Sequence, residues 1–169
     1  MRWKTLLVPH DFSPAAARAF ALACELAQLS GGRVLLLHIS PIPNGLRRDT
    51  KIVPDDGGPP VRIDEHMTSA AKKKLEILLA ERCQTGSVCA VASDGDCADV
   101  ILDEVKEHGA DVIVMGTHGR TGVKRLLLGS VAERVIRRAD VPVLVVRDPA
   151  NPEHTHLREE DAVADEEGG

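Results

Sequence analysis

The sequence predicts an α/β protein in which an open, five-stranded parallel sheet is covered by helices on both faces, giving three layers. Short apolar runs without polar alternation recur along the 169-residue chain, as expected of strands that are buried on both faces. Longer segments with apolar residues at helical spacing separate these runs, and strands that alternate with amphipathic helices indicate a parallel sheet. Aromatic residues make up only 2% of the chain, so the core must be aliphatic.

The first strand, the first helix and the second strand follow in order from the N-terminus. The apolar run Thr5–Pro9 predicts the first strand. Ser13 is a good N-cap and Pro14 fits the first helical position, so a helix is expected to begin there and to end at Gly31. The run Arg33–Ser40 predicts the second buried strand.

A Pro- and Gly-rich segment interrupts this alternation between Pro41 and Arg62. It holds five prolines and three glycines and shows no period, so we expect a mobile loop over residues 41–62. A helical stripe of apolar residues then predicts the second helix, from about Ile63 to Arg82.

The second half of the chain repeats the alternation of strand and helix. The expected elements are a weaker strand (Ser87–Ser93), a helix capped by Asp96 that ends near Gly109, a strand (Asp111–Met115), a short helix (about Val131–Arg138) and a fifth strand (Val141–Val146). Right-handed crossovers are expected between the strands, but periodicity does not give their order in the sheet.

The acidic charge of the chain is concentrated at its C-terminal end. The formal net charge is −5, and from Asp148 onward eight acidic residues accompany one basic residue, so residues 1–147 carry +2. We therefore expect one folded domain over residues 1–147 and an acidic, disordered tail over residues 148–169. A nearly neutral body with few aromatic residues argues against a nucleic-acid-binding protein.

The cysteines and the hydropathy of the chain indicate in which cellular compartment the protein is expected. The four cysteines form no C-x-x-C pair, and the histidines His10, His38 and His118 at strand ends lack the ligand spacing of a metal centre. We therefore expect no metal site. No apolar run approaches 18 residues and no signal peptide is recognisable, so no membrane span is expected. Together these features favour a cytoplasmic protein.

The segment after the fourth strand holds the features that point to a ligand. Gly116 lies at the carboxyl end of that strand, where ligands bind in open α/β sheets. A glycine at this position would let a ligand approach the backbone, and it could itself adopt a positive φ. Gly129 and Ser130 stand at the start of a helix, whose free N–H groups and dipole attract an anion. The pattern fits a nucleotide whose sugar lies against the first glycines and whose phosphates lie on the helix N-terminus.

Each of these residues also has a purely structural interpretation. Ser130 and Glu133 fit a capping box, in which each side chain satisfies the other's backbone amide, and Gly116 could serve only as a turn. The segment is not a Walker A loop, because no Lys-Ser/Thr pair follows a glycine. The combination is more specific than its parts.

The combination resembles the ATP-binding branch of the universal stress protein family. Gly116, Gly119, Gly129 and Ser130 form the pattern G-x-x-G, nine residues, then G-S, between the strands DVIVM and VPVLVV. The opening LLVPHDFS is similar to the family's first strand and its ligand-binding aspartate. The resemblance covers roughly Lys4–Arg147, and neither the Pro/Gly-rich loop nor the acidic tail belongs to the family pattern.

The resemblance implies the sheet order 3-2-1-4-5, which places a crevice between the carboxyl ends of strands 1 and 4. It implies that ATP, with or without Mg²⁺, binds in this crevice. The residues implied to contact the nucleoside are Pro9, Asp11, Ile39, Met115 and Gly116, and those implied to hold the phosphates are Gly119, Gly129, Ser130 and Val131. For Arg120, a phosphate contact and a solvated loop charge are equally open.

The expected function is that of a regulatory nucleotide sensor in the stress response. The sequence offers no evident general base or arginine finger, so rapid turnover is not expected. Two alternatives stay open: a slow ATPase or autophosphorylating protein that uses Ser130 or Thr117, and an interaction module without nucleotide. The implied order makes the fifth strand a sheet edge, so a homodimer through Val141–Val146 is expected, as is common in the family.

Overall fold

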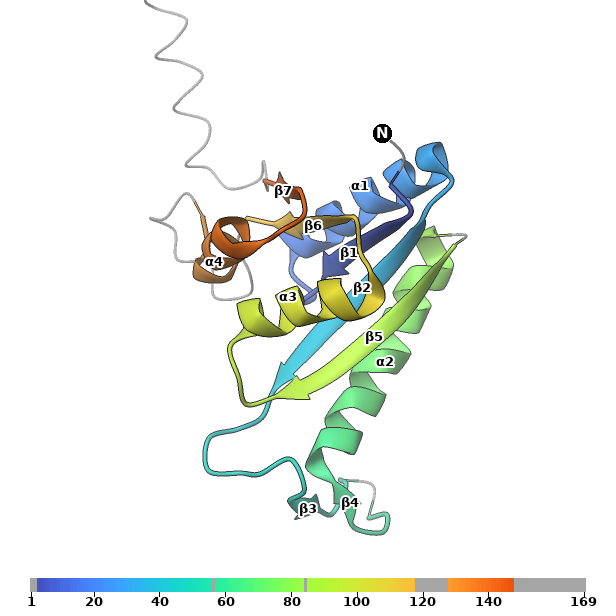
Figure 1. The fold of residues 1–169 in the computed structure, drawn as a ribbon. Coiled ribbons are helices and arrows are strands. Elements are labelled where there is room, and N and C mark those ends of the chain that lie inside the picture. The colour runs from blue at the N-terminus through green and yellow to red at the C-terminus, as the bar shows by residue number, and fades with distance from the viewer. Residues whose placement is uncertain (1–2, 56, 84, 118–127, 148–169) are drawn as a thin grey trace, which may run out of the picture.

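The computed structural model describes residues 3–55, 57–83, 85–117 and 128–147 (Figure 1). The strands in this part of the chain are β1 (Thr5–Pro9), β2 (Arg33–Pro41), β3 (Lys51–Ile52), β4 (Val61–Arg62), β5 (Gly86–Ser93), β6 (Val112–Gly116) and β7 (Val143–Val146). The helices are α1 (Pro14–Ser30), α2 (Ile63–Arg82), α3 (Cys97–His108) and α4 (Ser130–Arg138). None of these four helices combines the length and the apolar character that a membrane crossing requires. The acidic tail, residues 148–169, lies outside the described residues.

Five of the strands form one parallel sheet in the order β5-β2-β1-β6-β7. Numbered by their succession along the chain, these five strands have the order 3-2-1-4-5, so the predicted fold class and the implied strand order are confirmed. β1 pairs with β2 on one side and with β6 on the other. The sheet therefore grows in opposite directions from β1, and the switch point falls between β1 and β6.

Helices cover both faces of this sheet (Figure 1). On one face, Leu6 and Val8 of β1 pack with residues of α1 and α2, among them Phe20 and Leu75. On the other face, Leu7 of β1 packs with residues of α3 and α4. Leu6, Leu7 and Val8 are all 0% exposed, which explains why the sequence of this strand shows an unbroken apolar run instead of alternation.

The capping signals of α1 and α3 act as predicted. The Ser13 Oγ accepts a hydrogen bond from the amide of Ala16 at 3.2 Å, and Asp96 caps α3 in the same manner. Gly31 and Gly109 end these helices with φ of 65° and 58°, in the left-handed region that favours glycine. Each helix is therefore bounded at both ends by residues of the expected type.

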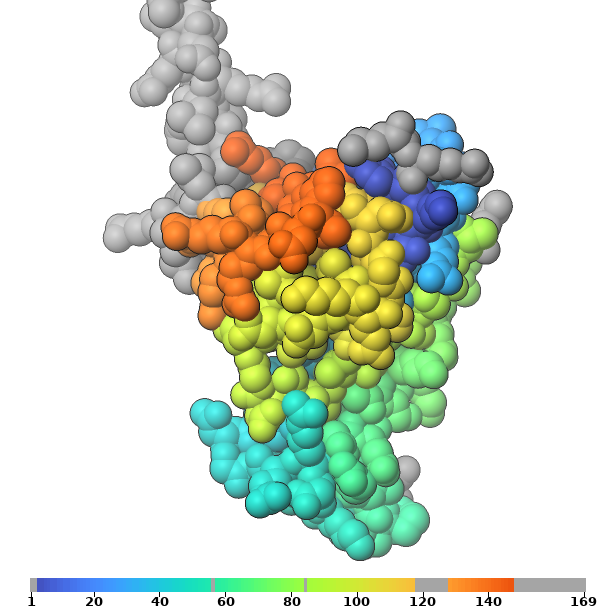
Figure 2. Space-filling model, viewed as in Figure 1, coloured from blue at the N-terminus to red at the C-terminus, as the bar shows by residue number. Residues whose placement is uncertain are grey.

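The segment between Pro41 and Arg62, which was expected to be a mobile loop, contains a small antiparallel sheet that the sequence did not predict. β3 pairs with β4 over two residues on each strand. The pair projects beyond the carboxyl edge of the main sheet (Figures 1 and 2), and Arg48 reaches back to the carboxylate of Asp94 at 3.1 Å. Strands of two residues have too few positions to produce a period, so the sequence pattern does not reveal them.

The boundaries near the predicted ligand site differ by one or two residues from those expected. β6 extends to Gly116, α4 begins at Ser130, and β7 begins at Val143. Pro142, which has no N–H, contributes only its carbonyl to the β6–β7 ladder, where it accepts the amide of Ile113 at 3.0 Å. The fifth strand is therefore shorter than predicted and lies at the edge of the sheet.

Candidate functional site

The strand ends that the sequence assigned to a ligand meet at the carboxyl edge of the sheet. β1 lies between β2 and β6, so Pro9, Ile39 and Gly116 lie along the same edge. The chain returns to this edge at Gly129, whose amide donates to the carbonyl of Thr117 at 2.7 Å. The structure therefore brings the ends of three strands and the N-terminus of α4 together.

The turn between β1 and α1 is held by its own side chains. The Oδ1 of Asp11 accepts the amide of Ser13 at 3.0 Å, and the Nδ1 of His10 accepts the amide of Phe12 at 3.2 Å. Between these bonds Phe12 adopts a φ of 65°, which is uncommon for a residue other than glycine. Asp11 is half-exposed, so this turn presents an oriented carboxylate at the edge of the sheet.

Two buried histidines lie behind this turn, and both belong to the strand ends at which the sequence places histidines. His10 is 5% exposed, and the Nδ1 of His38 lies 2.6 Å from the His10 carbonyl oxygen. Burial lowers the pKa of His10, the nearby His38 lowers it further, and Asp11 opposes them. Because Nδ1 accepts the Phe12 amide, the neutral ring has its proton on Nε2, an atom without a hydrogen-bond partner in the described part of the chain. His118 lies outside the described residues.

Gly116 is required by the packing of α1. A Cβ added at this position would lie 2.8 Å from the Cβ of Ala15 and 2.9 Å from its carbonyl carbon. Gly116 is not among the described glycines that have a positive φ, so the suggestion that it takes a positive φ is wrong. The neighbouring Met115 is buried in the cluster that faces α3 and α4.

The first turn of α4 has no side-chain cap. Its N-cap is Gly129, with φ of −71° and ψ of 151°, and among the described residues no side chain caps the first turn. The predicted capping box is therefore wrong: Ser130 is the first helical residue, and the carboxylate of Glu133 accepts a hydrogen bond from Arg137 at 2.8 Å instead. Helix geometry gives the first-turn amides no acceptor within the helix, and no described side chain accepts a hydrogen bond from them, which suits the binding of a ligand.

One arginine lies beside this helix start, and its charge is paired with an aspartate. Ser130 is exposed, and Val131 is half-buried against the cluster between the sheet and α3. The guanidinium of Arg134 donates to the Ser130 carbonyl at 3.3 Å and forms an ion pair with Asp96, the cap of α3. The amides of the first turn and the helix dipole therefore form a surface that suits an anion. Two residues implied to hold phosphates, Gly119 and Arg120, lie outside the described residues.

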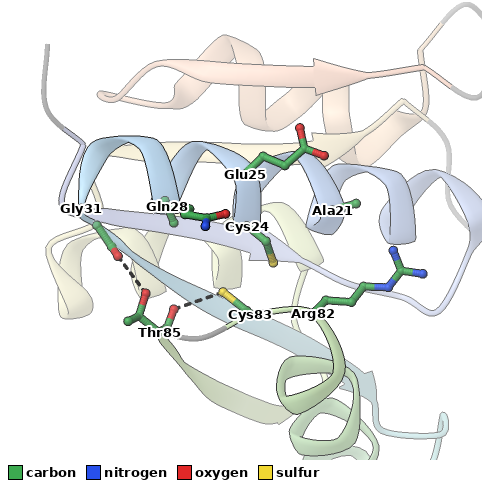
Figure 3. Close-up of a pocket in the computed structure, with 10 residues that line it drawn as sticks. Ala21, Cys24, Glu25, Gln28, Gly31, Arg82, Cys83 and Thr85 are labelled. Atoms are coloured by element: carbon green, nitrogen blue, oxygen red, sulfur yellow. Dashed lines mark hydrogen bonds between the residues drawn. The ribbon is translucent and has the colours of Figure 1, made fainter.

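A separate hollow of about 440 Å³ lies at the amino edge of the sheet, where the C-terminal ends of α1 and α2 meet (Figure 3). Cys24, Cys83 and Arg82 are among the residues that line it. Burial raises the pKa of the Cys24 thiol to about 12, and the neighbouring Cys83 adds to the shift. Cys24 is therefore a protonated, weakly nucleophilic thiol. None of the residues assigned to the nucleotide lines this hollow, so it is distinct from the carboxyl-edge site.

Comparison with known proteins identifies relatives over nearly the whole described chain. The model of the Universal stress protein family matches residues 2–147. Universal stress protein MJ0577 of Methanocaldococcus jannaschii is 32% identical over 154 residues, which cover 86% of this chain and 95% of the relative. A solved structure of protein MJ0577 superposes with a TM-score of 0.66 at 27% identity, covering 88% of this chain and 98% of that chain.

Two further solved structures share the fold at lower identity. A universal stress protein in complex with cAMP has a TM-score of 0.62 at 20% identity and covers 86% of this chain and 98% of its own. The universal stress protein from Archaeoglobus fulgidus in complex with dAMP has a TM-score of 0.59 at 22% identity and covers 86% and 99%. The family match and the relative from Methanocaldococcus jannaschii show that this chain belongs to the universal stress protein family.

Proposed function

We propose that this protein is a regulatory nucleotide sensor of the stress response that binds ATP at the carboxyl ends of β1 and β6. The observation that carries the proposal is the uncapped N-terminus of α4 beside those strand ends. First-turn amides and the helix dipole favour a phosphate, and the switch point of the sheet suits the rest of a nucleotide. The cAMP and dAMP complexes of two structural relatives support an adenine nucleotide as the ligand.

At the nucleoside end, the proposal gives Asp11 the role of a hydrogen-bond acceptor for the sugar. Its carboxylate is already oriented by the bond from the Ser13 amide. Pro9 and the backbone of Ile39 border the adenine from β1 and β2, and both residues are half-buried, as expected for the wall of a crevice. Met115 and Gly116 support the base and the sugar from the end of β6.

At the phosphate end, the amides of Ser130 and Val131 are proposed to hold the phosphates, and Gly129, whose own amide donates to the Thr117 carbonyl, is proposed to let them approach the backbone. Both helical amides precede the first intrahelical bond of α4, which runs from the Glu133 amide to the Gly129 carbonyl at 2.9 Å. Gly119 and Arg120 are proposed to complete the cradle. When Mg²⁺ accompanies ATP, it offsets part of the charge that the phosphates bring to this edge.

A second candidate function, slow autophosphorylation or ATP hydrolysis, is favoured by the exposure of Ser130. Its hydroxyl lies in the first turn of α4, where the terminal phosphate is proposed to lie, whereas Thr117 is only 3% exposed. In this reaction the Ser130 Oγ forms a bond to the γ-phosphorus, its proton passes to solvent, and ADP leaves. Incubation with ATP labelled at the γ-phosphate distinguishes the two functions, because a sensor keeps ATP intact and an autophosphorylating protein gains a label that Ser130→Ala removes.

The ligand itself is tested by the nucleotide content of the purified protein. We expect ATP to be released by heat and identified by mass spectrometry, and calorimetric titration to show that the emptied protein rebinds ATP. Release of a different nucleotide would replace ATP in the proposal. A protein that carries no nucleotide and binds none would instead be an interaction module.

We also propose that the protein is a cytoplasmic homodimer joined through β7. This strand forms one edge of the sheet. The carbonyls of Pro142 and Val146 accept hydrogen bonds on the side of β6. Because the backbone groups of successive strand residues point to opposite sides, the N–H and C=O of Val145 point outward. An outward-facing edge of this kind can pair with a second chain. Val145→Pro removes the outward N–H and should give a monomer by light scattering, whereas an unchanged dimer would place the interface elsewhere.

A further inference from the structure

Three side chains with metal-ligating atoms converge on a flank of the sheet that the nucleotide proposal does not use. They are Cys89 on the edge strand β5, and Glu104 and His108 on α3. The Cys89 thiol donates to the Oε2 of Glu104 at 3.4 Å, and the Nε2 of His108 lies 3.1 Å from the same oxygen. The three ligand atoms all lie within 4.8 Å of one another.

The fold itself brings these residues together. Glu104 and His108 are four residues apart on α3, so they lie one above the other on one face of the helix. Cys89 belongs to β5 and packs against the cluster on the sheet face that α3 covers. The cluster thus joins a helix to the outermost strand, between residues that are 15 positions apart in sequence.

The spacing is close to that of a tetrahedral zinc site. Zinc lies about 2.3 Å from a thiolate sulfur and about 2.0–2.2 Å from a nitrogen or oxygen ligand, which separates the ligand atoms by about 3.4–3.6 Å. The observed separations from Glu104 Oε2 are 3.4 Å to sulfur and 3.1 Å to nitrogen. Small side-chain rotations would therefore bring all three atoms onto one ion.

We propose that Cys89, Glu104 and His108 bind one Zn²⁺ ion, with water in the fourth position. A thiolate, an imidazole and a carboxylate form a donor set that selects zinc and similar transition metals over Mg²⁺ and Ca²⁺. All three residues are partly accessible to solvent, so an ion can reach the site and a water can complete its coordination.

The local charges favour a cation at this place. The Cys89 thiol donates to the carboxylate of Glu104, and the carboxylate of Glu107 adds negative charge nearby, while Lys72 opposes it. A bound zinc ion neutralises this negative environment and displaces the thiol proton to solvent. The cluster also lies at the last turns of α3, where the negative end of the helix dipole stabilises positive charge.

The bound ion would clamp α3 to β5. Ligands from both elements must remain in place for the ion to bind, so zinc should raise the melting temperature of the full chain. The clamp does not depend on the nucleotide proposal, because none of its ligands is among the residues assigned to ATP.

Cobalt titration of the full-length, chelator-treated and reduced protein tests the proposal. One equivalent of Co²⁺ should produce a thiolate-to-cobalt charge-transfer band in the near ultraviolet, and Zn²⁺ should abolish it by displacement. Cys89→Ser should lose the band. Cys97→Ser is the matched control, because it removes another half-buried thiol and should keep the band.

The remaining thiols provide the decisive control. A variant with Cys24→Ala, Cys83→Ser and Cys97→Ser leaves Cys89 as the single cysteine and should still give the band. His108→Gln changes a side chain that is 36% exposed, so the fold should persist while Co²⁺ affinity falls by at least about tenfold. No band in the wild-type protein would overturn the site, as would a band that survives Cys89→Ser or disappears only with Cys24 and Cys83.

Discussion

Two strand-to-helix junctions lie at the carboxyl edge of the sheet, β1–α1 and β6–α4. They differ in whether a side chain accepts a hydrogen bond from the first-turn amides of the helix. At β1–α1 the Ser13 Oγ accepts the Ala16 amide at 3.2 Å, and Asp11 accepts the Ser13 amide at 3.0 Å. At β6–α4 the N-cap is Gly129, and no side chain in the described part of the chain caps the first turn. The first helix start is completed by the chain itself, and the second is left to an external acceptor.

The helix α3, which follows β5 at the same edge, behaves like α1. Asp96 caps it by accepting the amide of Ala98 at 2.9 Å. α2 also lacks a side-chain cap, but its first amides donate to the carbonyls of Thr50 and Arg48. Among the described residues, only the start of α4 therefore has neither kind of acceptor for its first turn. Departures from self-sufficient capping are expected where a protein binds a ligand, because the binding energy then replaces the missing cap.

Gly116→Ala, which changes the β6–α4 junction and not the β1–α1 cap, should have the largest effect on stability. The added Cβ would lie 2.8 Å from the Cβ of Ala15, so α1 or β6 must shift. We expect the free energy of unfolding to fall by about 1–3 kcal/mol in urea denaturation. Gly95→Ala is the control, because its Cβ would meet only the Ser93 Oγ at 3.3 Å. Equal stability of the two variants would contradict the packing role of Gly116.

Ser13→Ala and Ser130→Ala compare the two helix starts directly. Ser13→Ala removes a cap and should lower the free energy of unfolding by about 1 kcal/mol. Ser130→Ala removes no cap, so stability should change by less than about 0.5 kcal/mol. Thermal and urea melts of both variants measure the difference, and a comparable loss in Ser130→Ala would restore the capping role of that residue.

Protonation of His10 should loosen the β1–α1 junction and leave α4 unaffected. Its Nδ1 accepts the Phe12 amide only when the ring is neutral, and its pKa is lowered from 6.5 by burial. Below about pH 6.5 the unfolded chain takes up a proton that the folded ring resists, so stability falls as pH decreases. His10→Asn keeps an acceptor that does not titrate. The pH dependence of urea unfolding should be shallower in this variant, and an unchanged slope would assign it to other groups.

The strand order and most helix boundaries were predictable because their signals are local or belong to a family pattern. Apolar runs give the buried strands, and Ser13, Gly31, Asp96 and Gly109 act at the ends of α1 and α3 as their types suggest. The order of the strands came from the resemblance, since periodicity contains no information on strand neighbours. The hairpin β3–β4 was missed because its strands are too short to show a period.

The predictions that were wrong at the candidate site concern short sequence patterns that are compatible with more than one local structure. Ser130 and Glu133 fit a capping box, but moving the helix start by one residue makes Gly129 the N-cap. For Gly116 a positive φ was one of the suggested roles, whereas the structure shows close contact with Ala15, about a hundred positions earlier in the chain. The contact between His10 and His38 follows from their positions at the ends of paired strands, but the sequence pattern does not give its geometry.

Gly129→Asp tests the central claim that the start of α4 is left uncapped to receive phosphates. The position has φ of −71° and ψ of 151°, which an N-cap aspartate adopts readily, and its carboxylate would accept the first-turn amides. The free energy of unfolding should stay constant or rise by about a few tenths of a kcal/mol. ATP affinity, measured by calorimetric titration, should fall by at least about 100-fold, or about 2.7 kcal/mol, because the carboxylate occupies the amides and repels the phosphates. Gly129→Val, which fills the same space without a cap, should also lose ATP but gain no stability. A folded Gly129→Asp protein that binds ATP as tightly as wild type would contradict the account.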